Sequence, residues 1–347
     1  MKKGANKPVQ KKNAAKHASG LMLFFMALTL FFVLLLPGCA DPEQENELME
    51  EAKTPIRMAY LYNDLHQLAY YVAQQKGFYE DAGLQVKEAG VYGSGVELMA
   101  AFQAGSLDAG YVGLAPATIA VANGKAEVNA VALANQVGSA LVVRDGLKVG
   151  KVEDLKGKRV AVPNLGTVQD FLLNRTLEEA GLKTTAVEKA FISPSEMISG
   201  MASEGIEACI AWEPYVSKLV NRGYGQVFLW SHEIWENHPC CVLAVDEEFL
   251  KNNREAAASL VEAHNRATDF ILQNKEEAEE MAKDFTGLSE DVVKEAMENI
   301  EFTSELDAEE AETYARYLVK QGLVKLEDTA AFMSDFIHES LLEEGIN

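Results

Sequence analysis

The sequence contains little cysteine and little positive charge. Only four cysteines occur in 347 residues, and three of them, Cys209, Cys240 and Cys241, follow position 39, so no framework of several disulfides is indicated. Lys and Arg number 31 against 53 Asp and Glu, which gives a formal net charge of −22. An acidic chain without a basic stripe is repelled by a phosphate backbone, and nucleic acid is therefore excluded as a partner.

Charge and hydropathy change sharply along the first forty residues. Six lysines and no acid precede a mainly apolar run from Leu21 to Leu36. This run of 16 residues is short for a membrane span and suits a signal-peptide core. It ends in Leu36-Pro37-Gly38-Cys39, which resembles the lipobox of bacterial lipoproteins, although Pro37 is unusual there. We expect 1–38 to be a lipoprotein signal peptide and Cys39 to be lipidated; the alternative is a plain transmembrane anchor or an uncleaved signal.

The segment that follows is rich in acids and poor in apolar residues. This composition predicts a flexible acidic tether over 39–54, so the body of the protein is expected outside the cytoplasm, anchored to the cell membrane. About 290 residues remain from position 55 onward, which is enough for two lobes with substantial cores.

An internal duplication, at an offset near 99 residues, organises the next part of the chain. Residues 92–99 align with 191–198, matching serine to serine and glutamate to glutamate, and 105–109 align with 204–208. Each half is predicted to be strand, helix, strand, helix, strand, over 56–62, 65–82, 84–89, 96–104 and 109–114, and over 159–162, 168–180, 185–190, 195–203 and 208–211. This alternation predicts an α/β fold with two parallel-type sheets flanked by helices. A strand at 242–245 and helices at 247–252, 254–274, 275–285, 289–299, 308–321 and 327–343 are expected to follow.

The ordered motifs resemble those of a known family. They include Lys76-Gly77-Phe78-Tyr79, Gly105-Ser106-Leu107-Asp108-Ala109, Asp154 to Val162, and Trp212-Glu213-Pro214-Tyr215. Over residues 55–342 the series resembles extracytoplasmic substrate-binding proteins of importers for nitrate, sulfonates, taurine and pyrimidine precursors. The resemblance implies a two-lobed periplasmic-binding-protein-like fold (type II) joined by two crossover strands. Lobe 1 is expected from 55–140 plus 241–347, and lobe 2 from 141–240.

Such folds bind ligands at the carboxyl ends of their strands, so the residues after each strand are the candidate ligand-binding residues. Helix starts there offer free N–H groups to an oxyanion, and small, amide and hydroxyl side chains leave room and hydrogen bonds for a polar solute. The alternatives are a surface His66, a turn in which Ser94 caps a helix, Trp212 in a lobe core and Glu213 in a salt bridge between lobes. The candidates are Asn63, Asp64, His66, Gly93, Ser94, Gly113, Pro116, Asn135, Gln136, Ser139, Gly166, Thr167, Gln169, Trp212, Glu213 and His238.

Two adjacent cysteines follow His238 and Pro239 at the expected return crossover. Thiolate and imidazole ligands suit soft metals and arsenicals, so Cys240 and Cys241 are candidates for a soft-metal or thiol-reactive site. However, adjacent residues of a strand point to opposite faces, which disfavours joint chelation, and free cysteines are commonly buried as small apolar residues. We therefore assign no metal and no cofactor from the sequence.

These features predict a monomeric receptor, not an enzyme. Its lobes are expected to hinge near 139–144 and 238–245, to close over a small anionic or zwitterionic solute, and to deliver it to an ABC permease and its ATPase. No arginine lies among the candidates to hold a sulfonate with two hydrogen bonds, which weakens that branch. A pyrimidine-forming enzyme of the same fold, a signalling receptor and a soft-metal receptor remain alternatives.

Overall fold

The computed structural model describes residues 54–306, 308–338 and 341. The expected signal peptide at 1–38, the lipidation site Cys39 and the expected tether up to residue 53 lie outside the described residues. Across the described ranges, none of the helices has both the length and the apolar character needed to cross a bilayer.

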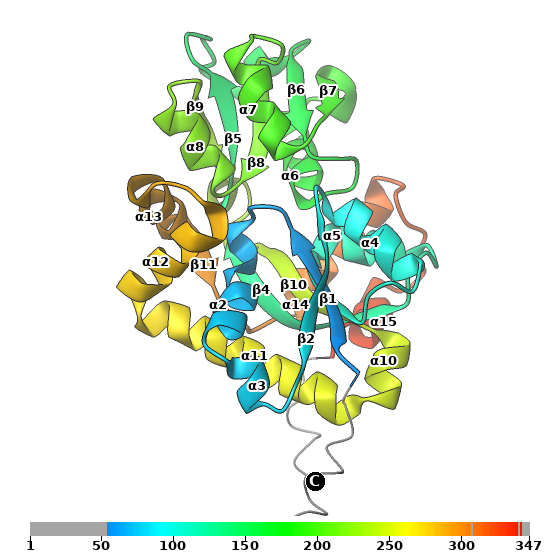
Figure 1. Cartoon of the computed structure of the whole chain (residues 1–347). Helices are drawn as coiled ribbons and strands as arrows, with labels where there is room; N and C mark the ends of the chain where they lie inside the picture. Colours follow the sequence, from blue (N-terminus) through cyan, green and yellow to red (C-terminus); the bar gives the residue numbers. More distant parts are fainter. Residues whose placement is uncertain (1–53, 307, 339–340, 342–347) are drawn as a thin grey trace, which may run out of the picture. The chain divides into compact units, whose positions relative to one another are not determined.

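The first sheet has six strands in the order β11-β4-β10-β3-β1-β2 (Figure 1). β1 pairs in parallel with β2 and β3, whereas β10 runs antiparallel to β3 and β4, and β11 antiparallel to β4. The sheet is therefore mixed, and the expected parallel arrangement holds for its β1-β2-β3 part alone. The strands are β1 (Ile56–Leu61), β2 (Val86–Tyr92), β3 (Ala109–Gly113), β4 (Val128–Val137), β10 (Pro239–Asp246) and β11 (Ile300–Phe302).

The second sheet repeats this plan with five strands in the order β7-β6-β8-β5-β9. β6 is parallel to β7 and β8, and β5 is antiparallel to β8 and β9. In the first sheet, β10 returns from the second sheet and runs antiparallel to β3. In the second sheet, β5 enters from the first sheet and runs antiparallel to β8. The strands are β5 (Ser139–Arg144), β6 (Arg159–Val162), β7 (Glu188–Phe191), β8 (Ala208–Trp212) and β9 (Gly225–Trp230).

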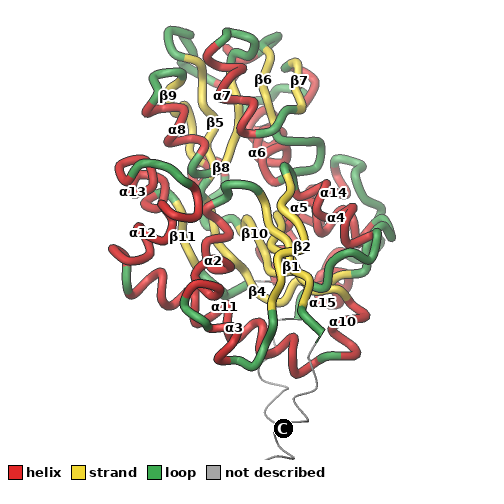
Figure 2. The backbone as a smooth tube through the Cα atoms, in the orientation of Figure 1, coloured by secondary structure: helices red, strands yellow, loops and turns green. Residues whose placement is uncertain are grey.

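Helices flank both sheets (Figure 2). The helix predicted over 65–82 is interrupted, because Gly77 adopts a left-handed φ of 72° that no regular helix accommodates. The helices associated with the two halves are η1 (Leu65–Gln67), α2 (Leu68–Gln75), α3 (Phe78–Asp81), α4 (Gly95–Gln103), α5 (Leu114–Ala122), η2 (Val152–Leu155), α6 (Val168–Glu179), η3 (Thr184–Ala186), α7 (Pro194–Ala202), α8 (Tyr215–Asn221) and α9 (Ser231–Ile234).

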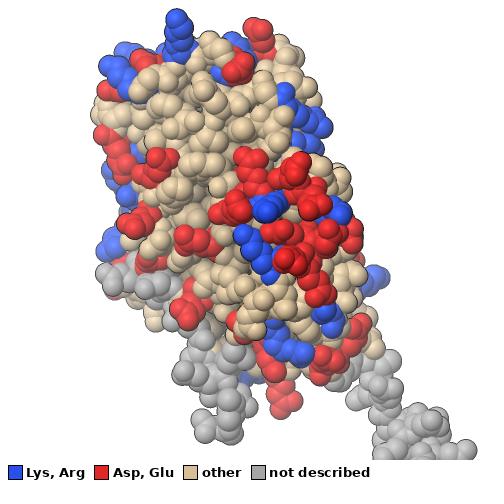
Figure 3. All heavy atoms as spheres, turned by 90° about the vertical axis from the view of Figure 1, so that its left-hand side faces the viewer, with Lys and Arg blue, Asp and Glu red and all other residues tan. Residues whose placement is uncertain are grey.

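The C-terminal third is mostly helical, as its sequence predicts. It comprises α10 (Glu247–Asn252), α11 (Arg254–Gln273), α12 (Lys275–Thr286), α13 (Glu290–Glu298), α14 (Ala308–Lys320) and α15 (Thr329–Phe336). Acidic side chains gather on one face of the protein with a few Lys and Arg among them (Figure 3). On α12 and α13 the acids Glu276, Glu280 and Asp291 are exposed to solvent.

The matched serine and glutamate of the duplication have a structural cause. Ser94 accepts a hydrogen bond from the Glu97 N–H at the start of α4, and Ser193 accepts one from Glu196 at the start of α7. In return, each glutamate carboxylate accepts from a backbone N–H at or before the cap, that of Gly93 at 3.0 Å and that of Ser193 at 3.0 Å. The repeated residues therefore satisfy helix N-termini.

Two short connections join the sheets. β4 passes into β5 through Gly138, and α9 is followed by residues 235–238 before β10. Both connections contain non-glycine residues in the left-handed region, Val137 at φ 51° and Asn237 at φ 52°. For a β-branched residue such as Val137 this conformation is a genuine outlier, so the first connection stores backbone strain.

Candidate ligand-binding site

A small cavity lies where strand ends of both sheets converge. Its volume is about 20 Å³, and it is lined by Leu61, Asp64, His66, Gly95, Gly113, Pro116, Thr167, Val168, Gln169, Trp212, Cys240 and Cys241. These residues end or follow β1, β2, β3, β6 and β8, or lie near the start of β10, so the carboxyl ends of five parallel strands contribute. Two larger hollows are an apolar groove of about 480 Å³ beside α4 and α5 and a surface hollow of about 980 Å³ near Arg57.

His66 is fixed in this cavity by bonds to its backbone and its ring. The Asp64 carboxylate accepts from the His66 N–H at 3.0 Å and from Gln67 Nε2 at 3.0 Å. The ring Nε2 lies 2.9 Å from the Gly138 carbonyl oxygen, which only accepts, so Nε2 carries a hydrogen and donates it. With 1% of His66 exposed, the surface-histidine alternative is wrong.

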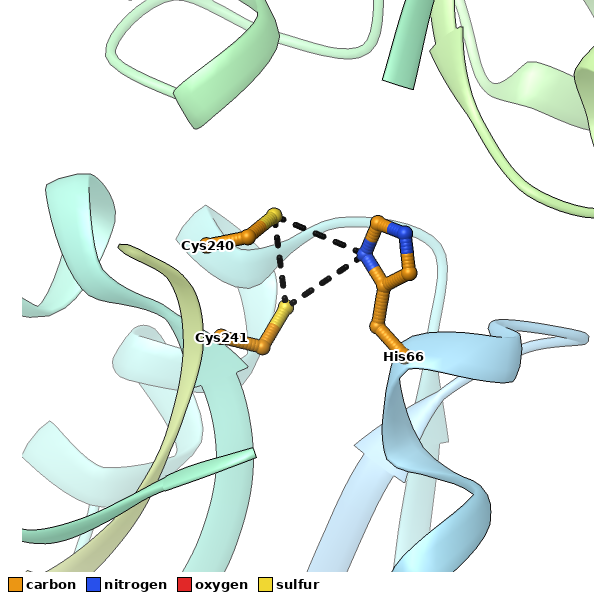
Figure 4. A group of neighbouring side chains, drawn as sticks. All are labelled: His66, Cys240 and Cys241. Carbon is orange, nitrogen blue, oxygen red and sulfur yellow. Dashed lines mark hydrogen bonds between the residues drawn. The ribbon is translucent and has the colours of Figure 1, made fainter. Parts of the chain in front are cut away.

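Nδ1 of the same ring faces two thiols (Figure 4). Cys240 Sγ lies 3.5 Å and Cys241 Sγ 3.9 Å from Nδ1, and the two sulfurs are 4.0 Å apart. The expectation that Cys240 and Cys241 point to opposite faces of the strand is therefore wrong. The pairing of β10 with β4 shifts register on both sides of Cys241, which breaks the regular alternation of side chains.

The three groups and Asp64 perturb one another because all are buried. Burial by itself lowers the pKa of His66, but the neighbouring Cys240 and Asp64 outweigh it and raise this pKa to about 9. The hydrogen bond from Cys241, together with His66, lowers the pKa of the Cys240 thiol despite its burial. The pKa of Cys241 is raised, first by that same contact with Cys240. Burial raises the pKa of Asp64 to about 7.

The second sheet presents the start of α6 to the cavity. Thr167 caps this helix, accepting from the Asp170 N–H at 3.3 Å, and the Gly166 N–H donates to the Asp170 carboxylate at 3.0 Å. Lys189 neutralises this carboxylate from 2.6 Å. The amides of Val168 and Gln169, both lining residues, belong to the first turn, whose N–H groups have no partner within the helix.

Trp212 adds a donor without an acceptor. The residue lines the cavity and is 3% exposed, yet its indole Nε1–H has no hydrogen-bond partner among the described residues. A buried donor left unpaired costs about 1–3 kcal/mol, so an acceptor brought by a ligand would recover that energy. Trp212 is thus both a wall of the cavity and a candidate hydrogen-bond donor.

The structure brings seven predicted residues together in the lining: Asp64, His66, Gly113, Pro116, Thr167, Gln169 and Trp212. Gly166 lies beside them but lines the larger apolar groove. Ser139 is buried behind Gln169, whose Nε2 donates to its hydroxyl at 3.0 Å.

The remaining predicted residues do not line the small cavity, and several have other partners. Asn63 and Gln136 are only partly buried, while Gly93 and Ser94 are engaged with Glu97 as described above. The Asn135 side chain bonds the backbone of Gln136, Val137 and Cys241. The Glu213 carboxylate accepts from Ser217 and from Asn299 Nδ2, and among the described residues it has no ion-pair partner, unlike the expected salt bridge between lobes. His238 packs against Trp235 and Tyr314.

Comparison with known proteins gives the family. A model described as the NMT1-like family matches residues 50–285. The chain belongs to the NMT1-like family. A protein of Brucella abortus (strain 2308) named as a binding protein is 30% identical over 237 residues, 67% of this chain and 71% of that protein. The taurine-binding periplasmic protein of Escherichia coli (strain K12) is 27% identical over 187 residues, 53% of this chain and 57% of that protein.

Solved structures share the fold of this family member. The alkanesulfonate-binding protein of Xanthomonas axonopodis pv. citri, bound to MOPS, superposes with a TM-score of 0.72 at 18% identity, covering 82% of this chain and 98% of that one. The periplasmic nitrate-binding protein of Synechocystis PCC 6803 gives a TM-score of 0.74 at 19% identity, covering 84% and 88%. The periplasmic-binding-protein fold and the family resemblance are therefore confirmed, with mixed instead of purely parallel sheets.

Five lining residues were not among the predicted ligand-binding residues: Leu61, Gly95, Val168, Cys240 and Cys241, of which the two cysteines were candidates for a soft-metal or thiol-reactive site alone. Leu61 and Val168 are apolar, and nothing in their types distinguishes them from core residues. The cysteine pair did carry a signal, because its sequence neighbour His238 suggested imidazole chemistry. The imidazole that meets the thiols is instead that of His66, 174 positions away from Cys240.

Proposed function

We propose that this protein is the solute-binding component of an ABC-type importer, which captures a small solute between two lobes and delivers it to a permease. The observation that carries the proposal is the cavity lined from both sheets, because a site shared between two lobes changes when they part or close. Membership of the NMT1-like family and the names of relatives as taurine-binding and nitrate-binding proteins support the same conclusion.

The proposed lobes are 55–140 plus 241–347 for the first and 141–240 for the second. The strands of the first sheet fall in the first set and those of the second sheet in the second, apart from the ends of β5 and β10 at the junctions. Opening would occur at the two connections, where Val137, Gly138 and Asn237 all have positive φ. Backbone held in sparsely populated conformations is typical of places where a fold switches between arrangements.

A solute with an oxyanion end suits the donors that face the cavity. These donors are the amides at the start of α6 and the Trp212 Nε1–H, and neither requires net positive charge on the protein. A volume of about 20 Å³ holds little more than one water molecule. A taurine-sized or sulfonate-sized ligand therefore enters only after the lobes separate.

The proposed setting follows from the family and from the leader sequence. A relative named as a periplasmic protein supports a position of the receptor outside the cytoplasm. We propose that lipidation of Cys39 anchors a monomer to the cell membrane, within reach of the permease, and that the tether allows the lobes to move. The protein acts as a receptor and not as an enzyme in this account.

Isothermal titration of the full chain in mild detergent with taurine, an alkanesulfonate, nitrate and a pyrimidine precursor tests the proposal. We expect saturable binding of at least one solute with one site per chain. Trp212→Phe keeps an aromatic wall but removes the unpaired N–H, and it should weaken binding about tenfold. Trp230→Phe, at a partly buried position of β9, is the matched control. No binding of any of these solutes at millimolar concentration would contradict the proposal.

A further inference from the structure

We infer that His66, Cys240 and Cys241 form a three-coordinate site for a single soft, thiophilic metal ion of the Cu(I) type. His66 and the adjacent cysteines come from distant parts of the chain, and their side chains point toward one another (Figure 4), where all three line the small cavity. Two sulfurs and one imidazole nitrogen form a donor set that suits soft ions such as Cu(I), whereas hard ions prefer oxygen donors.

The spacing of the donor atoms fits one central ion. Bonds of about 2.3 Å to sulfur and about 2.0 Å to nitrogen, arranged at ~120°, place the sulfurs about 4.0 Å apart and each about 3.7 Å from the nitrogen. The observed separations are 4.0 Å between the sulfurs, and 3.5 and 3.9 Å from His66 Nδ1. A trigonal ion therefore fits between the three atoms with movements of a few tenths of an ångström.

A hydrogen bond to the backbone already orients the His66 imidazole for binding a metal ion. Because Nε2–H donates to the Gly138 carbonyl, the ring presents Nδ1 to the thiols. The carboxyl group of Asp64, whose Oδ1 lies 3.6 Å from Nδ1, lies beside the site. Such partners of a liganding histidine fix its tautomer and orientation. On binding, the proton of each thiol that is not already ionised and the Nδ1 proton of the cationic imidazole leave to solvent, so that two thiolates and a neutral imidazole bind the ion.

The burial of the three residues and the small volume of the adjoining cavity restrict which metal ions the site can hold. All three residues are at most 3% exposed, which favours a weakly hydrated ion over one that keeps its waters. The adjoining space of about 20 Å³ accepts a single ion without separation of the lobes. The site needs neither Thr167 nor Trp212, so it goes beyond the proposed solute capture and stands independently of it.

The test is anaerobic titration of the reduced full chain with Cu(I) buffered by a chromogenic chelator. We expect one tightly held ion per chain, with X-ray absorption showing two sulfur and one nitrogen neighbours. Cys240→Ser and Cys241→Ser should each weaken retention at least tenfold. Cys209→Ala is the matched control, because Cys209 is a buried free thiol of β8 that is not part of the cluster. Mn(II), a hard ion, should not be retained.

Two results would overturn the inference. One is a Cu(I) stoichiometry that falls as much with Cys209→Ala as with Cys240→Ser. The other is a wild-type absorption spectrum without paired sulfur neighbours, a measurement that needs no variant and so survives misfolding of any substitution. Retention of solute by Thr167→Ala or Trp212→Phe is measured separately, so failure of the metal site and failure of the solute site are distinguishable.

Discussion

Replacing Gly138 by alanine tests whether the connection between the sheets holds His66 in place. Gly138 has φ 83°, and a Cβ added to it would lie 2.4 Å from His66 Nε2 and 3.0 Å from Ile300 Cγ1. That separation from Nε2 is far inside van der Waals contact, so the imidazole must move or the backbone must shift. Either change lengthens the bond between Nε2–H and the Gly138 carbonyl.

The magnitude has two parts. An alanine in the left-handed region costs about 1 kcal/mol. Losing a buried hydrogen bond while leaving its partners unpaired costs about 1–3 kcal/mol more. We therefore expect Gly138→Ala to lower the free energy of unfolding by about 3 kcal/mol, and to weaken binding of Cu(I) because Nδ1 moves with the ring.

Urea unfolding followed by circular dichroism measures the change, and Gly146→Ala provides the control. Gly146 has φ 74°, but an added Cβ there meets no atom within 4 Å. It should cost only about 1 kcal/mol, so the difference between the variants reports the clash with His66. In a His66→Ala background that difference should shrink. Equal costs for the two glycine variants, or a difference that persists without the imidazole, would refute the reasoning.

Three further outcomes are expected. Asp170→Asn should lower the free energy of unfolding by about 3 kcal/mol, because it leaves the Lys189 ammonium without its buried partner. The control is Glu179→Gln, at an exposed ion pair, which should change the urea midpoint little. His264 is buried and its pKa is lowered to about 4 by burial, so its neutral form contributes stability above pH 6.5 that is lost as pH falls toward 4. The free energy of unfolding of the wild type, minus that of His264→Gln, should fall by about 3 kcal/mol at most when unfolding is measured at a series of decreasing pH values. A difference that does not change with pH would contradict this prediction. Tyr111→Phe should cost about 1 kcal/mol in the same assay, because the phenol hydroxyl bonds His264 Nδ1 at 2.8 Å; no loss would show that the bond is not formed.

Regular elements of the fold were predictable from periodicity along the chain and, within 56–211, from the repeat of the two halves. Periodicity and glycine positions placed β6 over Arg159–Val162 and α10 over Glu247–Asn252 as the structure has them. The interruption at Gly77 was not foreseen, since a glycine inside an apolar helical pattern also occurs without a break. The long strand β4 was missed because both its faces are buried, so it lacks the alternation that marks a strand.

The candidate site was predictable where it depends on strand ends and unpredictable where it depends on side-chain partners. Asp64, His66, Thr167 and Trp212 follow predicted strands, and all line the cavity. Glu213 has the same kind of position, yet Ser217 and Asn299 take up its carboxylate. The meeting of His66 with the cysteine pair depends on two shifts of strand register, which no local sequence pattern encodes.

A structure of the protein with its bound solute tests the central claim most directly. We expect the solute between the two sheets, with an oxygen accepting from Trp212 Nε1–H and another at the amides of Val168 and Gln169. A solute seated instead in the apolar groove lined by Val96, Leu165 and Leu323, with the small cavity unchanged, would contradict it.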